Sequence, residues 1–334
     1  MLCNYLFVHV QKSSKHAIFR TITGSSDTSK NITLLDLERM NCMINTIENQ
    51  FLKISSTTHG GELHSILSKI DGTEFLWNGD ETFWKYHAPI LFPIVGKVNN
   101  NEYSVDGIKY TLPQHGLARV KDFELIEKNG NSFTYELKYS EETLNVFPFK
   151  FSLKIIYSLF ENTLNINYVV TNVDSKDMFF SIGAHPAFMC PLLDNETMDD
   201  YYFEFSENET SSLMPLNTNG FFKREQVPFL ENEKIIPLSK ELFKNDALVL
   251  KNLNSEIISL KSKNHSKSLD FNFSEFPYLG LWSKPTGAPF VCIEPWLGHS
   301  DFEDFTGDFS QKEGILMLEE NETFSCKYSI KFNV

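Results

Sequence analysis

The chain has 334 residues, of which 41% are hydrophobic and 22% are charged, and this balance excludes an intrinsically disordered protein. Its formal net charge of −14 at pH 7 disfavours polyanions, so we expect no nucleic acid partner. No apolar run is long enough to span a membrane, and the five scattered cysteines, without a CxxC or zinc-type spacing, favour a reducing cytoplasm.

Residues 1–45 are predicted to form a poorly packed N-terminal extension. Residues 21–33, TITGSSDTSKNIT, are polar and rich in turn-forming residues. The first 16 residues include a short apolar segment but no basic region and no A-x-A-like site, so we predict no signal peptide. A natural start at Met43 is an alternative explanation of this extension. Because the composition shows no break after residue 50, residues 46–334 are predicted to form one large domain, with two tandem sandwiches as the alternative.

Beyond residue 50 the hydrophobic residues recur with a period of two, which is typical of strands with one buried face. The pattern is clearest in the segments SFTYELKYS (132–140), FKFSLKIIYSLF (149–160), TLNINYVV (163–170) and TFSCKYSIKF (323–332). The predicted buried side chains are Phe133, Tyr135, Leu137, Tyr139, Phe149, Phe151, Leu153, Ile155, Tyr157, Leu159, Leu164, Ile166, Tyr168, Val170, Phe324, Cys326, Tyr328, Ile330 and Phe332.

The connections between these segments are short. KNGN (128–131) and FENT (160–163) predict hairpin turns. Closely spaced strands with short turns predict an all-β fold whose mostly antiparallel sheets pack as a sandwich or barrel. Helical signals are sparse, and PLSKELFKND (237–246) predicts one short helix capped by Ser239.

Three histidines interrupt the strand pattern beside a glycine or proline. His115 lies in LPQHGLAR, His185 in SIGAHPAF and His299 in EPWLGHSD. A turn at the end of a strand holds a side chain rigidly, which favours a functional role. The alternative for each histidine is an ordinary hydrogen bond that caps a loop.

The segment FVCIEPWLG (290–298) ends an apolar run with a carboxylate. A buried Glu294 is costly unless it is paired or functional, and burial raises a carboxyl pKa towards the value that a general base needs. We therefore expect Glu294 and a histidine at strand ends to form an acid–base pair, with a structural salt bridge or a solvent-facing glutamate as alternatives. Pro295 is predicted to end the strand, and Trp296 offers a flat apolar face to a sugar ring.

Other chemistries find little support in the sequence. There is no HExxH motif or closely spaced ligand pair, so no metal site is predicted, and the acidic run DFEDFTGDF (301–309) is interpreted as a solvated loop. GxGxxG, P-loop and GxSxG motifs are also missing, which argues against nucleotide chemistry and a serine nucleophile. Lys97 could hydrogen-bond a hydroxylated or anionic ligand. The aromatic residues upstream of it are interpreted as core or rim packing: Trp77, Phe83, Trp84 and Tyr86.

Seven segments in the same order resemble the aldose 1-epimerase (galactose mutarotase) family, in particular its LacX-like branch. They are LFPIVGK, LPQHGLAR, SIGAHPAF, LFKNDALVL, YLGLWSKP, FVCIEPW and TGDF. The resemblance covers roughly residues 50–334 and excludes the N-terminal extension. It implies a large antiparallel β-sandwich with few short helices, the galactose mutarotase-like supersandwich, with a sugar bound in an open cleft. It also implies interconversion of α and β anomers of an aldohexose without a cofactor or metal.

The resemblance assigns roles to individual residues. Glu294 is expected to be the general base that takes the proton of the C1 hydroxyl, and His185 the general acid that protonates the ring oxygen. The further substrate contacts that it implies are His115, Asp246, Arg119, Lys97 and Trp282. In this interpretation Gly183 and Ala184 leave room for the sugar ring, and Pro186 fixes the turn that aims the imidazole.

Lys97 is a departure, because relatives usually carry arginine at the end of LFPIVGK and lysine lacks the bidentate fork of a guanidinium. Substrate preference therefore stays open between a free hexose, which the acidic composition favours, and a hexose 6-phosphate. A non-catalytic sugar-binding protein on the same fold is an alternative, and a glycosidase or lyase that uses Asp246 and Glu294 is a third. The expected partner is a small sugar, and the expected state is a monomer or homodimer.

Overall fold

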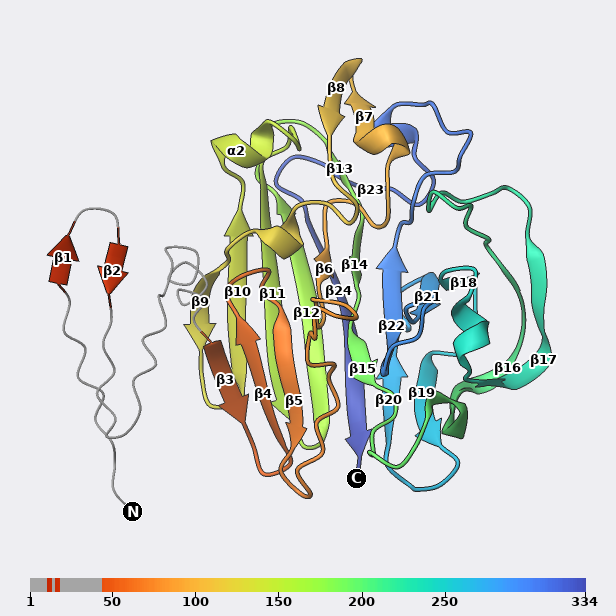
Figure 1. Cartoon of the computed structure of the whole chain (residues 1–334). Helices are drawn as coiled ribbons and strands as arrows, with labels where there is room; N and C mark the ends of the chain where they lie inside the picture. Colours follow the sequence, from red (N-terminus) through yellow and green to blue (C-terminus); the bar gives the residue numbers. More distant parts are fainter. Residues whose placement is uncertain (1–10, 14–15, 19–43) are drawn as a thin grey trace. The chain divides into compact units, whose positions relative to one another are not determined.

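The computed structural model describes residues 11–13, 16–18 and 44–334 (Figure 1). The chain divides into two compact units, Met1–Ile44 and Asn45–Val334. In the first unit, β1 (Gln11–Ser13) and β2 (His16–Ile18) pair antiparallel. The polar segment 21–33 and Met43, on which the predicted extension rests, lie outside the described residues.

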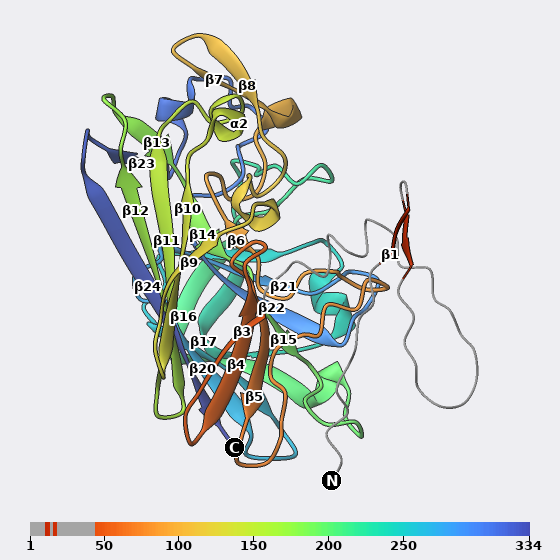
Figure 2. The same cartoon turned by 90° about the vertical axis from the view of Figure 1, so that its left-hand side faces the viewer.

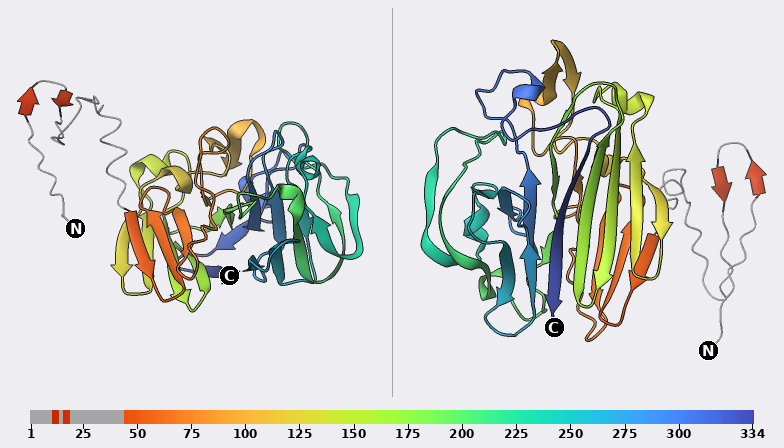
Figure 3. Two further views of the ribbon diagram at one scale, coloured as in Figure 1. Left: turned by 60° about the horizontal axis from the view of Figure 1, so that its bottom comes forward. Right: turned by 180° about the vertical axis from the view of Figure 1, so that it is seen from behind.

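The second unit is dominated by one nine-stranded sheet in which all neighbouring strands are antiparallel. In order across the sheet its strands are β17 (Val227–Pro237), β16 (Tyr201–Leu213), β19 (Ile257–Ser262), β20 (Ser268–Asn272), β24 (Thr323–Asn333), β12 (Thr163–Asn172), β11 (Phe151–Phe160), β10 (Ser132–Lys138) and β9 (Glu124–Lys128). The view from behind in Figure 3 looks onto the open face of this sheet.

Smaller sheets form a second layer over the other face, as Figures 1 and 2 show. A three-stranded sheet contains β3 (Ile44–Glu48), β4 (Leu52–Thr57) and β5 (Leu63–Ser68). A six-stranded sheet contains β18 (Leu248–Lys251), β21 (Tyr278–Trp282), β22 (Phe290–Leu297), β14 (Ile182–Ala184), β6 (Ile90–Leu91) and β15 (Ala187–Met189). Two further antiparallel pairs complete the strands of this unit. They are the hairpin of β7 (Glu102–Val105) with β8 (Ile108–Thr111), and β13 (Met178–Phe180) with β23 (Leu316–Leu318), two strands far apart in the sequence.

The helices are short. Those in the described part of the chain are α2 (Glu141–Leu144) and the 3-10 helices η1 (Asn99–Asn101), η2 (Ala118–Val120), η3 (Met198–Asp200), η4 (Lys240–Phe243) and η5 (Phe309–Gln311). Among the described residues, no helix is both long and apolar enough to cross a membrane. The prediction of an all-β fold, a large antiparallel β-sandwich with few short helices, is confirmed.

The two layers bury the alternating side chains that the sequence pattern indicates. Seventeen of the nineteen predicted core residues are at most 7% exposed, whereas Phe324 is only partly buried and Tyr139 is 38% exposed. Tyr139 escapes burial because β10 ends at Lys138, so the next residue lies beyond the covered part of the sheet. A hydrogen bond also joins the layers, because the Tyr157 hydroxyl donates at 2.8 Å to the carbonyl of Gly61, two residues before β5.

Both predicted hairpins are confirmed, because β9 pairs with β10 and β11 with β12 across the two predicted turns. The predicted helix within 237–246 is only the 3-10 helix η4, and the predicted cap is wrong, since the Ser239 side chain makes no capping hydrogen bond. The helix cannot continue because Asp246 has a φ of 81°, in the left-handed region.

Core packing in β11 offers a direct test of the sandwich. Phe151, at one end of the strand, is fully buried, and Phe160, at the other end, is 70% exposed. We expect Phe151→Ala to lower the free energy of unfolding by about 3–5 kcal/mol, because it leaves a cavity between the layers. Phe160→Ala is the matched control and should change it by at most about 0.5 kcal/mol. Urea unfolding measures both, and equal effects would contradict the described burial.

Candidate active site

Glu294 lies inside a fully buried strand, not at its end. All eight residues of β22 are buried, and Glu294 is the fifth. The prediction that Pro295 ends the strand is wrong, because pairing continues through Leu279 with Pro295 and Tyr278 with Trp296. Proline removes one N–H donor from the ladder, and the pairs on both sides of it keep the strand in place.

His185 lies in the interruption between β14 and β15, two short strands that pair with the same strand, β22. Gly183 pairs with Trp296 and Ala187 pairs with Cys292. The position midway between these two pairs places His185 opposite Glu294. The His185 N–H donates to the Pro89 carbonyl at 3.1 Å, so the interruption is tied to the chain before β6. The register of the sheet therefore creates a cross-strand histidine–glutamate pair.

Gly183, two residues before His185, has a different role from the one predicted. A Cβ atom added at Gly183 would lie 2.8 Å from Cδ1 of Trp296 and 3.0 Å from the Pro295 carbonyl oxygen. Ala184 is only 1% exposed. The prediction that these residues leave room for a sugar is wrong, since Gly183 makes room for the Trp296 ring.

The two titratable groups are in contact and almost dry. His185 Nε2 lies 3.3 Å from Glu294 Oε2. His185 is 8% exposed and Glu294 is 1% exposed. Neither Nδ1 of His185 nor Oε2 of Glu294 has a hydrogen-bond partner among the described residues, so the 3.3 Å contact is a close approach of the two groups and not a formed hydrogen bond. Proton transfer between the two side chains therefore needs no large movement.

Burial moves the two pKa values in opposite directions. It raises the pKa of the Glu294 carboxyl well above its usual range, and the negative charge of Asp246 adds to this rise. It lowers the pKa of His185 to about 3, and the Arg119 guanidinium contributes to this fall. Both shifts favour the uncharged forms, a protonated carboxyl and a neutral imidazole, in which the pair shares one ionisable proton.

A second histidine stands beside the first. The His115 and His185 rings meet edge to face with centroids 5.6 Å apart. His115 has a φ of 64°, and its Nδ1 accepts a hydrogen bond of 3.2 Å from the Gly96 N–H. The His115 Nε2 lies 3.1 Å from Nε2 of the Gln114 side-chain amide, so both ring nitrogens have polar partners. Burial lowers the pKa of His115 well below its usual value, and the positive charges of Arg119 and Lys97 add to this fall.

These side chains line a cavity of about 200 Å³. This volume is below the roughly 300–1,000 Å³ of sites for drug-sized ligands, so it suits a smaller molecule. The cavity brings together six predicted site residues: Lys97, His115, His185, Asp246, Trp282 and Glu294. Trp296 lines it as well.

Arg119, the seventh predicted site residue, lies outside the lining of this cavity. Its guanidinium lies over the Tyr86 ring, 5.0 Å from the centroid, and its Nη2 donates to the Gln114 carbonyl at 2.7 Å. Its Nε is buried without a hydrogen-bond partner among the described residues. The position of Arg119 therefore allows it to influence His185 through its charge.

Two parts of the site were missed by sequence reasoning. The segment 216–222 lines the cavity, and the Asn219 carbonyl accepts a hydrogen bond of 2.8 Å from Lys97 Nζ. The Trp84 ring, interpreted as packing, lies against His185 with centroids 4.7 Å apart. The Asn219-Gly220 pair is a turn signal that marks the segment in the sequence, but no local pattern links it to a histidine.

His299 and the acidic run lie to one side of the cavity. His299 is fully buried, does not line the cavity and donates from Nδ1 to the Ser300 carbonyl at 2.6 Å. The interpretation of 301–309 as a solvated loop is wrong at Asp301, which is 4% exposed and binds Lys312 Nζ at 2.6 Å. Because its backbone N–H donates to the Lys97 carbonyl at 2.8 Å, this buried ion pair supports the wall of the site.

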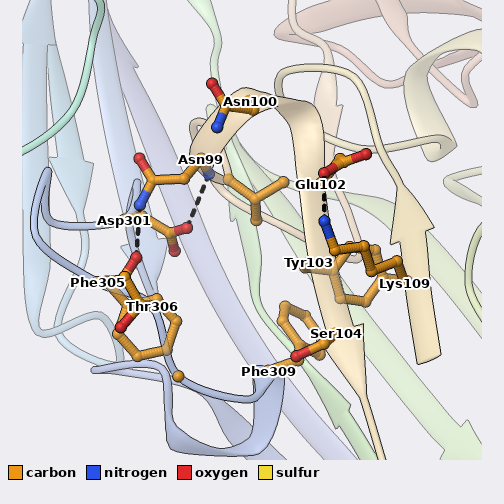
Figure 4. A pocket seen from close by; sticks show the side chains of 12 residues that line it. Asn99, Asn100, Glu102, Tyr103, Ser104, Lys109, Asp301, Phe305, Thr306 and Phe309 are labelled. Carbon is orange, nitrogen blue, oxygen red and sulfur yellow. Dashed lines mark hydrogen bonds and ion pairs between the residues drawn. The ribbon is translucent and has the colours of Figure 1, made fainter. Parts of the chain in front are cut away.

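A larger cavity of about 260 Å³ lies between the β7–β8 hairpin and the loop 301–309 (Figure 4). Its polar groups bind one another, with Lys109 Nζ 3.1 Å from Glu102 Oε2 and the Asn99 N–H 2.9 Å from Asp301 Oδ2 (Figure 4). This cavity lacks an acid–base pair among its described lining residues. The smaller cavity is therefore the candidate active site.

The opposite pKa shifts predict the pH dependence of any reaction that uses the single shared proton. Activity should persist below the ordinary histidine pKa of 6.5, because His185 takes up a second proton only near pH 3. Removing the cation in Arg119→Gln should move the acid limb of the kcat profile to higher pH. Removing the anion in Asp246→Asn lowers the pKa of Glu294 and should move the alkaline limb to lower pH. Unchanged limbs in both variants would contradict the described electrostatics.

The chain is similar to known proteins both in sequence and in structure. A model of the family described as "Aldose 1-epimerase" matches residues 43–316. The chromosomal LacX protein of Lactococcus lactis is 38% identical over 263 residues, 76% of this chain and 87% of that protein. A galactose mutarotase related enzyme of Lactobacillus acidophilus has a TM-score of 0.83 at 35% identity, over 87% of this chain and 98% of that one. A galactose mutarotase-like protein of Lactobacillus casei has a TM-score of 0.82 at 32% identity, over 87% and 100%.

Proposed function

Because this chain belongs to the aldose 1-epimerase family, we propose that it interconverts the α and β anomers of an aldohexose, with Glu294 and His185 as its acid–base pair. The observation that carries this proposal is the 3.3 Å contact between the two side chains in the lining of one cavity. Ring opening and closure transfer protons and break and re-form the C1–O5 bond without a change of oxidation state, so the reaction calls for no redox or group-transfer cofactor.

The shared proton explains how a neutral pair performs this chemistry. Transfer of the proton from Glu294 to His185 converts the uncharged pair into a carboxylate and an imidazolium. The carboxylate then takes the proton of the C1 hydroxyl while the imidazolium protonates the ring oxygen, and the C1–O5 bond breaks. The aldehyde turns about C1–C2, and the ring closes with the two roles reversed. Each cycle returns the single proton to the pair.

The other lining residues are proposed to hold the sugar. The ring faces of Trp282 and Trp296 offer apolar surface to the C–H groups of a pyranose. The His115 imidazole can form a hydrogen bond with a sugar hydroxyl, and the Asp246 carboxylate is an acceptor. The Lys97 ammonium already donates to the Asn219 carbonyl and has further protons for a ligand oxygen.

The cavity favours a free hexose over a hexose 6-phosphate. Lys97 is the only lysine or arginine among the described residues that line it, and the lining also carries the carboxyl groups of Asp246 and Glu294. A phosphate binds best where several cations or backbone N–H groups converge. We propose that the protein acts on this sugar in the cytoplasm, as a monomer or homodimer.

The direct test is to follow anomer exchange in freshly dissolved α-D-glucose, α-D-galactose and glucose 6-phosphate by polarimetry or NMR exchange spectroscopy. We expect acceleration over buffer, larger for a free hexose. Tight sugar binding without acceleration would replace the proposal with a sugar-binding protein. Cleavage of an aryl glycoside would instead favour a hydrolase that uses Asp246 and Glu294, whose charges influence each other.

A further inference from the structure

A second group of titratable side chains lies outside the sugar cavity. Glu62 immediately precedes β5, His64 lies on β5, and His87 precedes β6. One ligand atom from each lies within 4.8 Å of the others. The two imidazole rings are stacked, with centroids 4.0 Å apart. None of the three residues lines the sugar cavity, and the proposed reaction does not use them.

A hydrogen bond fixes the proton of the His64 imidazole on Nε2. The Thr57 hydroxyl donates to the His59 carbonyl at 2.9 Å, so it accepts from His64 Nε2 at 3.2 Å. Nδ1 of His64 therefore keeps a free lone pair, as in metal-ligating histidines. Nδ1 of His87 is buried without a hydrogen-bond partner among the described residues.

The glutamate supplies an oxygen. Glu62 is 5% exposed, and its Oε1 accepts the N–H groups of His87 at 2.7 Å and Ala88 at 2.9 Å. These are the hydrogen bonds that the Glu62 carboxylate makes to described residues, and they leave its Oε2 free. A buried carboxylate with one free oxygen is stabilised by a cation.

We propose that Glu62, His64 and His87 bind a divalent transition-metal ion of the zinc class. Two nitrogens and one carboxylate oxygen are donors that Zn²⁺ accepts, with the fourth position left to water. Ligand atoms at about 2.0–2.1 Å in a tetrahedron lie about 3.4 Å apart. The ligand atoms already lie within 4.8 Å of one another, so they must draw in by at most about 1.4 Å. The two stacked imidazole rings must also rotate until their planes meet at the metal.

A metal here would position the catalytic turn. The His87 carbonyl accepts the Ala187 N–H at 2.9 Å, and the Pro89 carbonyl accepts the His185 N–H at 3.1 Å. The segment 87–89 is thus bonded on both sides of the histidine in the proposed acid–base pair. An ion that holds His87 also holds this segment, so its role is structural and it touches no substrate.

The test is zinc titration of the EDTA-treated full-length protein by calorimetry, with thermal unfolding as a second readout. We expect one Zn²⁺ per chain and a rise in Tm on zinc addition. His64→Ala and Glu62→Gln should each weaken binding at least about tenfold and remove the Tm rise. His265→Ala is the matched control, because His265 also lies beside a glutamate, Glu196, at 3.0 Å but belongs to another part of the chain.

A second group of possible metal ligands lies in the sugar site, so the test must also show to which of the two groups zinc binds. His185, Cys292 and Glu294 also bring ligand atoms within 4.8 Å of one another. Zinc binding that survives in Cys292→Ser and disappears in His64→Ala supports the proposal. Binding that disappears in Cys292→Ser, or is unchanged in both His64→Ala and Glu62→Gln, overturns it, as does no binding by the unaltered protein at millimolar zinc. None of these outcomes depends on epimerase activity.

Discussion

Replacing Glu294 with glutamine is expected to slow catalysed anomer exchange by a factor of about 10²–10⁴, the usual contribution of a general acid or base. Glutamine has nearly the same shape and can accept a hydrogen bond, but it cannot take the proton of the C1 hydroxyl. Since burial already favours the uncharged carboxyl, a neutral amide should be tolerated in β22. NMR exchange spectroscopy at saturating sugar measures the rate.

Glu209→Gln is the matched control for this variant. Glu209 is also 1% exposed, and its carboxylate accepts the backbone N–H groups of Asn254 and Ser255, away from the sugar cavity. Glu209→Gln should lower stability without lowering kcat, whereas Glu294→Gln should lower kcat without lowering stability. A Glu294→Gln protein that retains the original kcat would remove Glu294 from the proposed mechanism.

The fold could be predicted from the sequence where strands have one covered face. The alternation in β10, β11, β12 and β24 arises because one side of the large sheet meets the second layer. β22 is buried on both sides, so its sequence shows no alternation, and Pro295 is then the local signal that predicts its end. A proline marks a strand end only when the pairing on both sides stops there as well.

The site could be predicted in its chemistry but not in its geometry. A carboxylate in an apolar run predicts a functional Glu294 because such burial is costly, and the neighbouring glycine and proline predict a functional His185. That the two face each other depends on the register of β14 and β15 on β22, which no local pattern encodes. Trp84 likewise reaches His185 only through folding, since 100 positions separate them in the sequence.

The burial of Asp301 shows the same limit. Its neighbours Glu303 and Asp304 are exposed, as the acidic composition predicts. Asp301 differs because Lys312, eleven positions later, enters the interior with it, and the pair offsets the cost of removing either charge from water. Composition describes the average exposure of a loop and misses the one acidic residue that this loop buries.

His185→Asn is expected to lower kcat by about 10²–10⁴ as well, because asparagine can fill the turn and donate a hydrogen bond but cannot shuttle a proton. The backbone bond to the Pro89 carbonyl does not need the imidazole, so the turn between β14 and β15 should persist. Sugar affinity, measured by calorimetry, should change much less than kcat, since other lining residues hold the substrate. A loss of affinity with unchanged kcat would make His185 a binding residue only.

The double variant His185→Asn/Glu294→Gln separates a proton-sharing pair from two independent groups. If the two side chains pass one proton between them, either single variant already disables the relay, and the double variant should be no more than a few-fold slower than the worse single one. Independent groups would multiply their effects, to about 10⁴-fold or more. Because Nε2 and Oε2 lie 3.3 Å apart in a nearly dry interior, we expect the first result, and multiplication of the two effects would contradict the shared proton.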